Sequence, residues 1–257
     1  MNVALEICVG TIGGALAARR GGADRIELCA ALSEGGITPS EGLIAAALEI
    51  EGIKKNVIIR PRSGDFLYDK DEQRVMLADI RTAVRLGADG IVAGALLPDG
   101  GIDTEFLRRC LDAADGLPFT FHRAFDLCSD PRRALDLLMA AGVSRVLTSG
   151  AAATAEQGIP LLKELVRQGG TDIIIMPGCG VTEQNVARIV CETGAREVHS
   201  SASATVGSKM LFRHGGVAMG KGDADEYARR ETCAERVNAL KQILNEISEG
   251  KIGRNLT

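Results

Sequence analysis

A glycine-led unit recurs four times along the chain and constrains the fold more than any other feature. Glycine, a small residue, two further residues and a short apolar run begin at Gly22, Gly87, Gly142 and Gly194. A helical pattern precedes each glycine, and glycine just past a helix end supplies the left-handed conformation that other residues adopt at a cost. A β-rich run and another helical pattern follow, which is typical of parallel strands joined by crossover helices.

Eight strand–helix units can be placed on this rhythm. We predict strands at residues 5–9, 25–29, 57–60, 90–93, 119–123, 145–148, 173–176 and 197–200. Helices are predicted at 12–20, 39–50, 70–86, 103–113, 131–141, 157–168, 183–193 and 225–249. With 257 residues, 46% of them hydrophobic, the chain fits one α/β domain, a single (β/α)₈ TIM-type barrel spanning residues 1–257.

An open doubly wound sheet is the alternative architecture. Such a sheet usually carries a glycine fingerprint for a dinucleotide after its first strand. The segment at residues 10–14 (GTIGG) does not have that spacing. The sequence therefore favours the barrel, and no nucleotide cofactor is predicted.

The connection after the eighth strand is long and rich in glycine, at about residues 201–224. Unstructured connections of this length are uncommon in compact domains and are often functional. It carries Lys209, Arg213 and His214. Two interpretations stay open, a lid that contacts an anion and a mobile surface loop.

Charge and cysteine usage exclude several classes of partner. The 30 basic and 34 acidic residues give a net charge of -4, without the concentrated basic surface that nucleic acid or anionic membranes require. No apolar run approaches the roughly 18 residues of a membrane span, and no secretory signal pattern is visible. The seven cysteines are scattered and do not form a disulfide framework. We expect a cytoplasmic protein with reduced thiols that binds neither nucleic acid nor membrane.

Polar side chains on the predicted strands identify a site. Alternation along a strand turns Leu5, Ile7, Ile26 and Leu28 toward the helices. The residues left facing the barrel interior are Glu6, Cys8, Glu27, Cys29, Arg60 and His122, with Thr148 and His199 as additions. Buried carboxylates require cationic partners, and Arg60 and His122 are the expected ones. The alternative is a purely structural polar network.

Cys8 and Cys29 lie on neighbouring predicted strands, each two residues after a glutamate. Adjacent strands are about 4.8 Å apart, so the two thiols can approach each other. A pair of thiolates suits a soft ion of low coordination number such as Cu(I). The alternative is two small buried residues, since free cysteine is among the most buried residue types.

The same barrel mouth also fits an enzyme for a small anionic, possibly phosphorylated, metabolite. Phosphate sites in such barrels use the turns after strands seven and eight, which carry Gly178, Gly180, Ser200 and Ser201 here. In this hypothesis the anion is clamped by Arg60 and Arg62. Glu6 or Glu27 acts as general base and His122 or His199 as the partner acid. Further polar groups for ligand binding are Arg123, Asp126 and Thr148.

Six sequence blocks, in order, resemble the CutC copper-homeostasis family. They are GGADRIELC at 21–29, LSEGG with TPS at 32–40, IRPR with GDF at 59–66, FHRAFD at 121–126, RVLTSG at 145–150 and MPG at 176–178. The resemblance implies a cytoplasmic TIM-type barrel, a homo-oligomer and a role in copper homeostasis. It also implies that Cys8 and Cys29 are the Cu(I) ligands. One departure is Cys179, which stands where the family has glycine.

Overall fold

The computed structural model describes residues 2–217 and 225–252 and contains one ring of parallel strands. Their bounds are β1 Ala4–Val9, β2 Arg25–Leu28, β3 Lys54–Ile58, β4 Gly90–Ala93, β5 Phe119–Phe121, β6 Arg145–Thr148, β7 Ile174–Pro177 and β8 Glu197–Ser200. Neighbours pair in the order β7-β6-β5-β4-β3-β2-β1-β8, and β7 lies beside β8. The predicted (β/α)₈ barrel is therefore confirmed.

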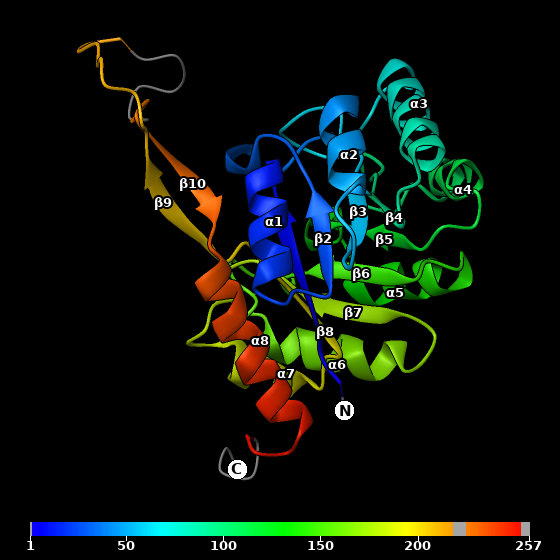
Figure 1. Cartoon of the computed structure of the whole chain (residues 1–257). Helices are drawn as coiled ribbons and strands as arrows, with labels where there is room; N and C mark the ends of the chain where they lie inside the picture. Colours follow the sequence, from blue (N-terminus) through cyan, green and yellow to red (C-terminus); the bar gives the residue numbers. More distant parts are fainter. Residues whose placement is uncertain (1, 218–224, 253–257) are drawn as a thin grey trace.

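The helices surround this ring (Figure 1). They are α1 Ile12–Arg20, α2 Glu41–Leu48, α3 Lys70–Leu86, α4 Thr104–Ala113, α5 Pro131–Ala140, α6 Ile159–Gly169, α7 Val186–Thr193 and α8 Ala234–Ser248. Two short 3₁₀ turns, η1 Leu32–Glu34 and η2 Arg123–Leu127, follow β2 and β5. Arg123, predicted inside a strand, thus begins a turn.

The glycines of the repeated unit adopt the backbone conformation for which the sequence selects them. Gly22, Gly87, Gly142 and Gly194 have φ values of 87°, 97°, 80° and 76°. A Cβ atom is disfavoured in this left-handed region, so each glycine can end a helix and turn the chain into the next strand. The repeat therefore marks the positions in the sequence where a helix ends and the next strand begins.

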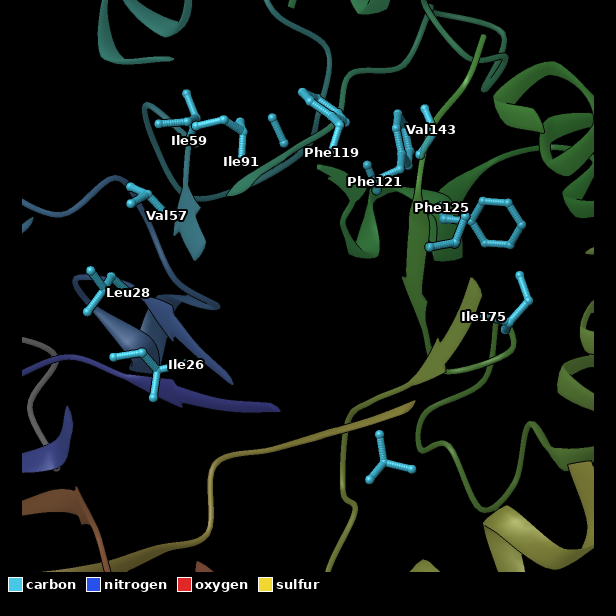
Figure 2. Close-up of a cluster of buried hydrophobic side chains, with 14 of the residues drawn as sticks. Ile26, Leu28, Val57, Ile59, Ile91, Phe119, Phe121, Phe125, Val143 and Ile175 are labelled. Carbon is cyan, nitrogen blue, oxygen red and sulfur yellow. The ribbon is translucent and has the colours of Figure 1, made fainter. Parts of the chain in front are cut away.

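The main hydrophobic core lies between the strands and the helices. Figure 2 shows its side chains around the outside of the strand ring, among them Ile26, Leu28, Phe119, Phe121 and Ile175. These side chains are buried. Since alternate residues of each strand point the other way, polar side chains such as Glu27 and Thr120 remain inside the ring. The predicted division between the two faces is correct.

The segment after β8 differs from the prediction. Two strands, β9 Ser203–Gly207 and β10 Ala228–Thr232, pair antiparallel and project from the barrel (Figure 1). The predicted helix at 225–249 is therefore wrong in its first part, since α8 begins only at Ala234. A strand at 228–232 depends on pairing with residues far away in sequence, which local composition does not reveal. Part of the predicted 201–224 loop, residues 218–224, lies outside the described residues.

Candidate functional site

A charged network fills the interior near the amino ends of the strands. Arg25, the first residue of β2, forms ion pairs with both Glu6 and Glu197. Arg145, the first residue of β6, contacts Glu197 at 2.7 Å and 3.0 Å through Nε and Nη2. Burial alone would raise the pKa of Glu6, but Arg25 and His199 lower it to about 2. Each charge of this network has a partner of opposite sign.

The expected cationic partners of the interior carboxylates were therefore wrong. Glu6 contacts Arg25 and His199, not Arg60 or His122. The side chain of Asn56 also reaches Glu6, at 3.4 Å. Glu6 does not line the mouth cavity, and a carboxylate with a pKa near 2 is a poor base. Of the two predicted general bases, only Glu27 faces the cavity.

Above the network, toward the carboxyl ends of the strands, lies a cavity of about 560 Å³. Its base contains the two thiols with Glu27 and His199. Around them are residues from the 3₁₀ turns, the strand ends, the turn after β7, the projecting hairpin and α8: Arg60, His122, Arg123, Asp126, Gly180, Ser200, Ser201, Arg230 and Arg236. Most of the predicted site residues thus meet in one place, as expected for the carboxyl face of such a barrel.

Cys8 and Cys29 both line this cavity but are not opposite each other. Cys8 pairs in register with Glu27, and the amide of Cys29 donates to Val9 at 2.9 Å. From the sequence, Cys8 and Cys29 are expected to lie side by side. In the structure Cys29 lies two residues further toward the mouth than the partner of Cys8. The two side chains still pack in one cluster with Ile58 and Val92.

Hydrogen bonds hold the thiols among carboxylate and imidazole groups. Cys29 Sγ donates to Glu27 Oε2 at 3.4 Å, and Cys8 Sγ lies 3.8 Å from the carbonyl oxygen of Ser200. Burial, and then the carboxylate of Glu27, raise the pKa of Cys29 well above its ordinary value. In the metal-free protein Cys29 is therefore a thiol at neutral pH.

His199 connects the charged network to the cavity. Its Nδ1 lies 2.9 Å from Glu6 Oε1 and its Nε2 lies 3.7 Å from Glu27 Oε2. Burial opposes its charge, but Cys8, Glu6 and Glu27 together raise the pKa of His199 well above its ordinary value. Burial also raises the pKa of Glu27. His199 thus contacts the carboxyl groups of both Glu6 and Glu27, and Cys8, Glu6 and Glu27 favour its charged form.

Arg60 and Arg62 do not form the predicted clamp. Arg60 lines the cavity, and its guanidinium donates to the carbonyls of Glu34, Gly36 and Gly64. Arg62 does not line the cavity. It forms ion pairs with Glu72 and Asp65 and lies over the ring of Tyr68. Residues 60 and 62 would share a face only on a continuing strand, but β3 ends at Ile58, and of the two arginines only Arg60 lines the mouth cavity.

Asp126 anchors the turn after β6. It accepts hydrogen bonds from Thr148 Oγ1 and from the amide of Ser149, and Arg123 Nε lies 2.8 Å from Oδ2. Thr148 is fully buried and does not line the cavity. Thr148 therefore supports the mouth from behind, whereas Asp126 and Arg123 both line it.

The turn after β7 brings backbone close to the cavity. Gly178 has no room for a side chain, since an added Cβ would lie 2.4 Å from Leu147. Gly178 itself does not line the cavity, whereas Cys179 and Gly180 do. Ser200 Oγ donates to the carbonyl of Val181 at 2.7 Å, so its hydroxyl is already engaged.

Sequence reasoning missed two cavity-lining arginines. Arg230 belongs to β10, and Arg236 belongs to α8, where it contacts Glu183 at 2.7 Å. Both follow the long connection, so no local motif marked them. Lys209, Arg213 and His214, considered for a lid, lie further along the hairpin and do not line the cavity.

Residues 2–217 and 225–252 contain neither a ready-made metal cluster nor a membrane-spanning helix. In this part of the chain, no cluster of three or more His, Cys, Asp or Glu side chains is arranged to hold a metal ion. No helix within the same ranges is long and apolar enough to cross a bilayer.

The fold and the mouth define the class of protein, a (β/α)₈ barrel with a thiol-lined polar cavity toward the carboxyl ends of its strands. The model of the CutC family matches residues 3–204. A family protein CutC from Bacteroides thetaiotaomicron is 50% identical over 93% of this chain and 97% of its own length. A human protein named copper homeostasis protein cutC homolog is 47% identical over 95% of this chain and 89% of its own.

A solved structure agrees with these sequence matches. The crystal structure of CutC from Streptococcus agalactiae has a TM-score of 0.74 and 38% identity, and it covers 78% of this chain and 99% of that one. The chain therefore belongs to the CutC family.

Proposed function

We propose that this protein acts in copper homeostasis by binding Cu(I) through Cys8 and Cys29 at the mouth of the barrel. The observation that carries the proposal is that both thiols line the base of one cavity and pack in a single cluster. The name of the human relative, copper homeostasis protein cutC homolog, agrees with it. Two thiolates are sufficient ligands for Cu(I), which tolerates low coordination numbers.

The surroundings of the thiols are compatible with this ion. Binding requires thiolates, so Cys29 must release its proton when the metal arrives. Glu27 Oε2 accepts the hydrogen bond of that thiol and is a nearby acceptor for the proton. Cu(I) then takes the place of the proton on Cys29 Sγ, and the protons that the two thiols release pass to Glu27 and to solvent. The buried neighbours Ile58 and Val92 shield the site on one side.

A Cu(I) titration of the reduced protein against a chromophoric chelator tests the proposal. We expect one equivalent to bind to the wild type and the competition to disappear in Cys8→Ser/Cys29→Ser. Cys191→Ser, on α7 and outside the cavity, is the matched control and should bind as the wild type does. Cys179→Ser shows whether the third cavity thiol contributes. Binding by the double variant as tight as that of the wild type would refute the proposal.

We further propose a cytoplasmic location and a homo-oligomer. All seven cysteines are free, in agreement with a compartment that keeps thiols reduced. The projecting hairpin exposes Met210, Leu211 and Phe212, and Leu211 is fully accessible. Adjacent exposed apolar side chains of this kind are typical of protein contacts. A second copy of the chain is the proposed partner.

The alternative function is an enzyme for a small anionic metabolite. Its predicted machinery now lacks Glu6 and Arg62, which do not face the cavity. Glu27, Arg60, His122 and His199 remain. These residues leave open whether a second kind of ligand occupies the space that a copper ion would not fill.

A further inference from the structure

Two buried polar atoms on the wall of the mouth cavity have no protein partner. Within the described residues, the buried side-chain atoms without a hydrogen bond are Glu27 Oε1, Arg60 Nε, Tyr68 Oη and His122 Nε2. Arg60 and Tyr68 are neighbours and interact with each other. Glu27 and His122 are 4% and 3% exposed and both line the cavity. Buried polar groups are nearly always paired, so these two require a partner from the cavity.

His122 offers a hydrogen-bond donor to the cavity. Its Nδ1 accepts from the amide of Ala124 at 3.2 Å, which places the ring proton on Nε2. Burial, and then the charge of Arg60, lower the pKa of His122 to about 3, so the ring is neutral. The ring of Phe66 lies 4.8 Å from the imidazole and fixes its orientation. The group presented is therefore a rigid N–H donor that suits an acceptor oxygen.

Arg60 supplies a buried positive charge without an anion beside it. Its side chain is 6% exposed, and its terminal nitrogens donate only to neutral backbone carbonyls. Among the described residues, no carboxylate lies within ion-pair distance of Arg60, whereas Arg25 and Arg145 have theirs. Phe66 packs against both Arg60 and His122, so the charge and the free donor share one wall. Water can satisfy the donor, but it cannot neutralise the guanidinium.

The rim adds to the positive field. Arg230 lines the cavity and donates to the backbone and hydroxyl oxygens of Ser203, with no ion pair among the described residues. Arg123 and Arg236 are neutralised by Asp126 and Glu183. The lining arginines Arg60, Arg123, Arg230 and Arg236 outnumber the lining carboxyl groups of Glu27, Glu34 and Asp126 by one, and a cavity with an excess of one charge attracts ligands of the opposite charge.

We infer that the mouth cavity binds a small hydroxylated organic anion, with its carboxylate or phosphate group near Arg60 and His122 Nε2 and a hydroxyl at Glu27 Oε1. A hydroxyl both donates and accepts, so it satisfies Glu27 in either protonation state. The cavity of about 560 Å³ is within the range for small-molecule sites, whereas a single metal ion needs a small part of it. This site is separate from the copper proposal and does not depend on it.

Thermal unfolding of the reduced full-length protein with matched pairs of anions tests the inference. Propyl phosphate is compared with glycerol 3-phosphate, and propionate with lactate. We expect one hydroxylated probe to raise the midpoint of unfolding and its partner without a hydroxyl to do so less. The two pairs distinguish a phosphate from a carboxylate ligand. No shift with any probe, or equal shifts within both pairs, would overturn the inference.

Variants then locate the binding. His122→Phe keeps the ring against Phe66 and removes the donor, so we expect at least tenfold weaker binding of the active probe by calorimetry. Arg62→Lys, next to the cavity but outside it, is the control and should bind normally. Cys8→Ser/Cys29→Ser should also retain the anion while it loses Cu(I), so the two proposals can fail separately. Unchanged binding by His122→Phe would refute the assignment.

Discussion

The two ends of the barrel interior treat charge in opposite ways. At the amino ends of the strands, Arg25 and Arg145 are each paired with buried carboxylates. At the carboxyl ends, within residues 2–217 and 225–252, no carboxylate lies at ion-pair distance from Arg60, and His122 Nε2 has no hydrogen-bond partner. The same residue types are thus used for a complete network at one end and an incomplete one at the other.

This difference suggests that the two ends of the barrel interior have different roles, one in stability and one in ligand binding. A closed ion-pair network leaves nothing for a ligand to add, and its removal exposes a buried charge. An incomplete network gains stability when a ligand completes it. His199 lies between the two, since it contacts Glu6 below and Glu27 above. The paired charges of the barrel therefore lie beneath the charges that we propose bind a ligand.

The largest expected effect comes from breaking the closed end. Arg25→Met leaves Glu6 and Glu197 with one cation fewer, so we expect the free energy of unfolding to fall by about 3–5 kcal/mol. Arg230→Met, an exposed mouth arginine without an ion pair among the described residues, should change it by about 0.5 kcal/mol or less. Urea denaturation at neutral pH measures both. An equal decrease in the free energy of unfolding for both variants would contradict the proposed contrast between the paired and the unpaired end of the barrel.

The second effect is the increase in stability expected when Cu(I) binds to Cys8 and Cys29 at the carboxyl end. At free Cu(I) one hundred times above its dissociation constant, the reduced wild type should gain about 2.7 kcal/mol. Cys8→Ser/Cys29→Ser should gain nothing, and Cys191→Ser should gain as much as the wild type. Thermal unfolding under anaerobic conditions gives the increments. A gain retained by the double variant would place the metal elsewhere.

The third effect is acid sensitivity due to His122. Its pKa is about 3 in the folded protein against 6.5 in the unfolded chain, so protons favour the unfolded state between these values. Stability is therefore fully present above pH 6.5 and falls by about 1.4 kcal/mol per unit as the pH decreases toward 3. Between pH 6.5 and 5 this amounts to about 2 kcal/mol.

The comparison variant for this prediction is His122→Phe. This variant should lack the part of the pH dependence that comes from His122. The difference in the free energy of unfolding between the variant and the wild type should therefore become smaller as the pH falls. The contribution of Glu6, with a pKa of about 2, is lost only below about pH 4.5 and is common to both proteins. Denaturation curves at several pH values test this, and parallel slopes would show that His122 is not the responsible group.

The smallest effect on stability is expected outside the barrel. Leu211→Ser/Phe212→Ser alters exposed side chains of the projecting hairpin, so the free energy of unfolding of the monomer should change by about 0.5 kcal/mol or less. The mass in solution, measured by light scattering, should fall if these side chains join two copies. A wild-type protein that is already monomeric would contradict the proposed homo-oligomer.

Much of the architecture can be derived from local sequence patterns. The glycine repeat places the helix-to-strand turns, and two-residue alternation separates Ile26 and Leu28 from Glu27 and Cys29. Most of the predicted mouth residues meet in one cavity because parallel strands bring their carboxyl ends together. The hairpin strand at Ala228–Thr232 was missed because its partner is more than twenty residues away.

The sequence by itself determined the barrel and most of the polar residues at its mouth, because these follow from short periodicities and glycine conformation. Only the tertiary structure decided which charges are paired. The register of β1 against β2 sets Cys8 opposite Glu27 and Glu6 opposite Arg25. Arg145 and Glu197, 52 residues apart, meet through the closure of the ring. Electrostatic partners depend on distances across the barrel, and no local pattern encodes those distances.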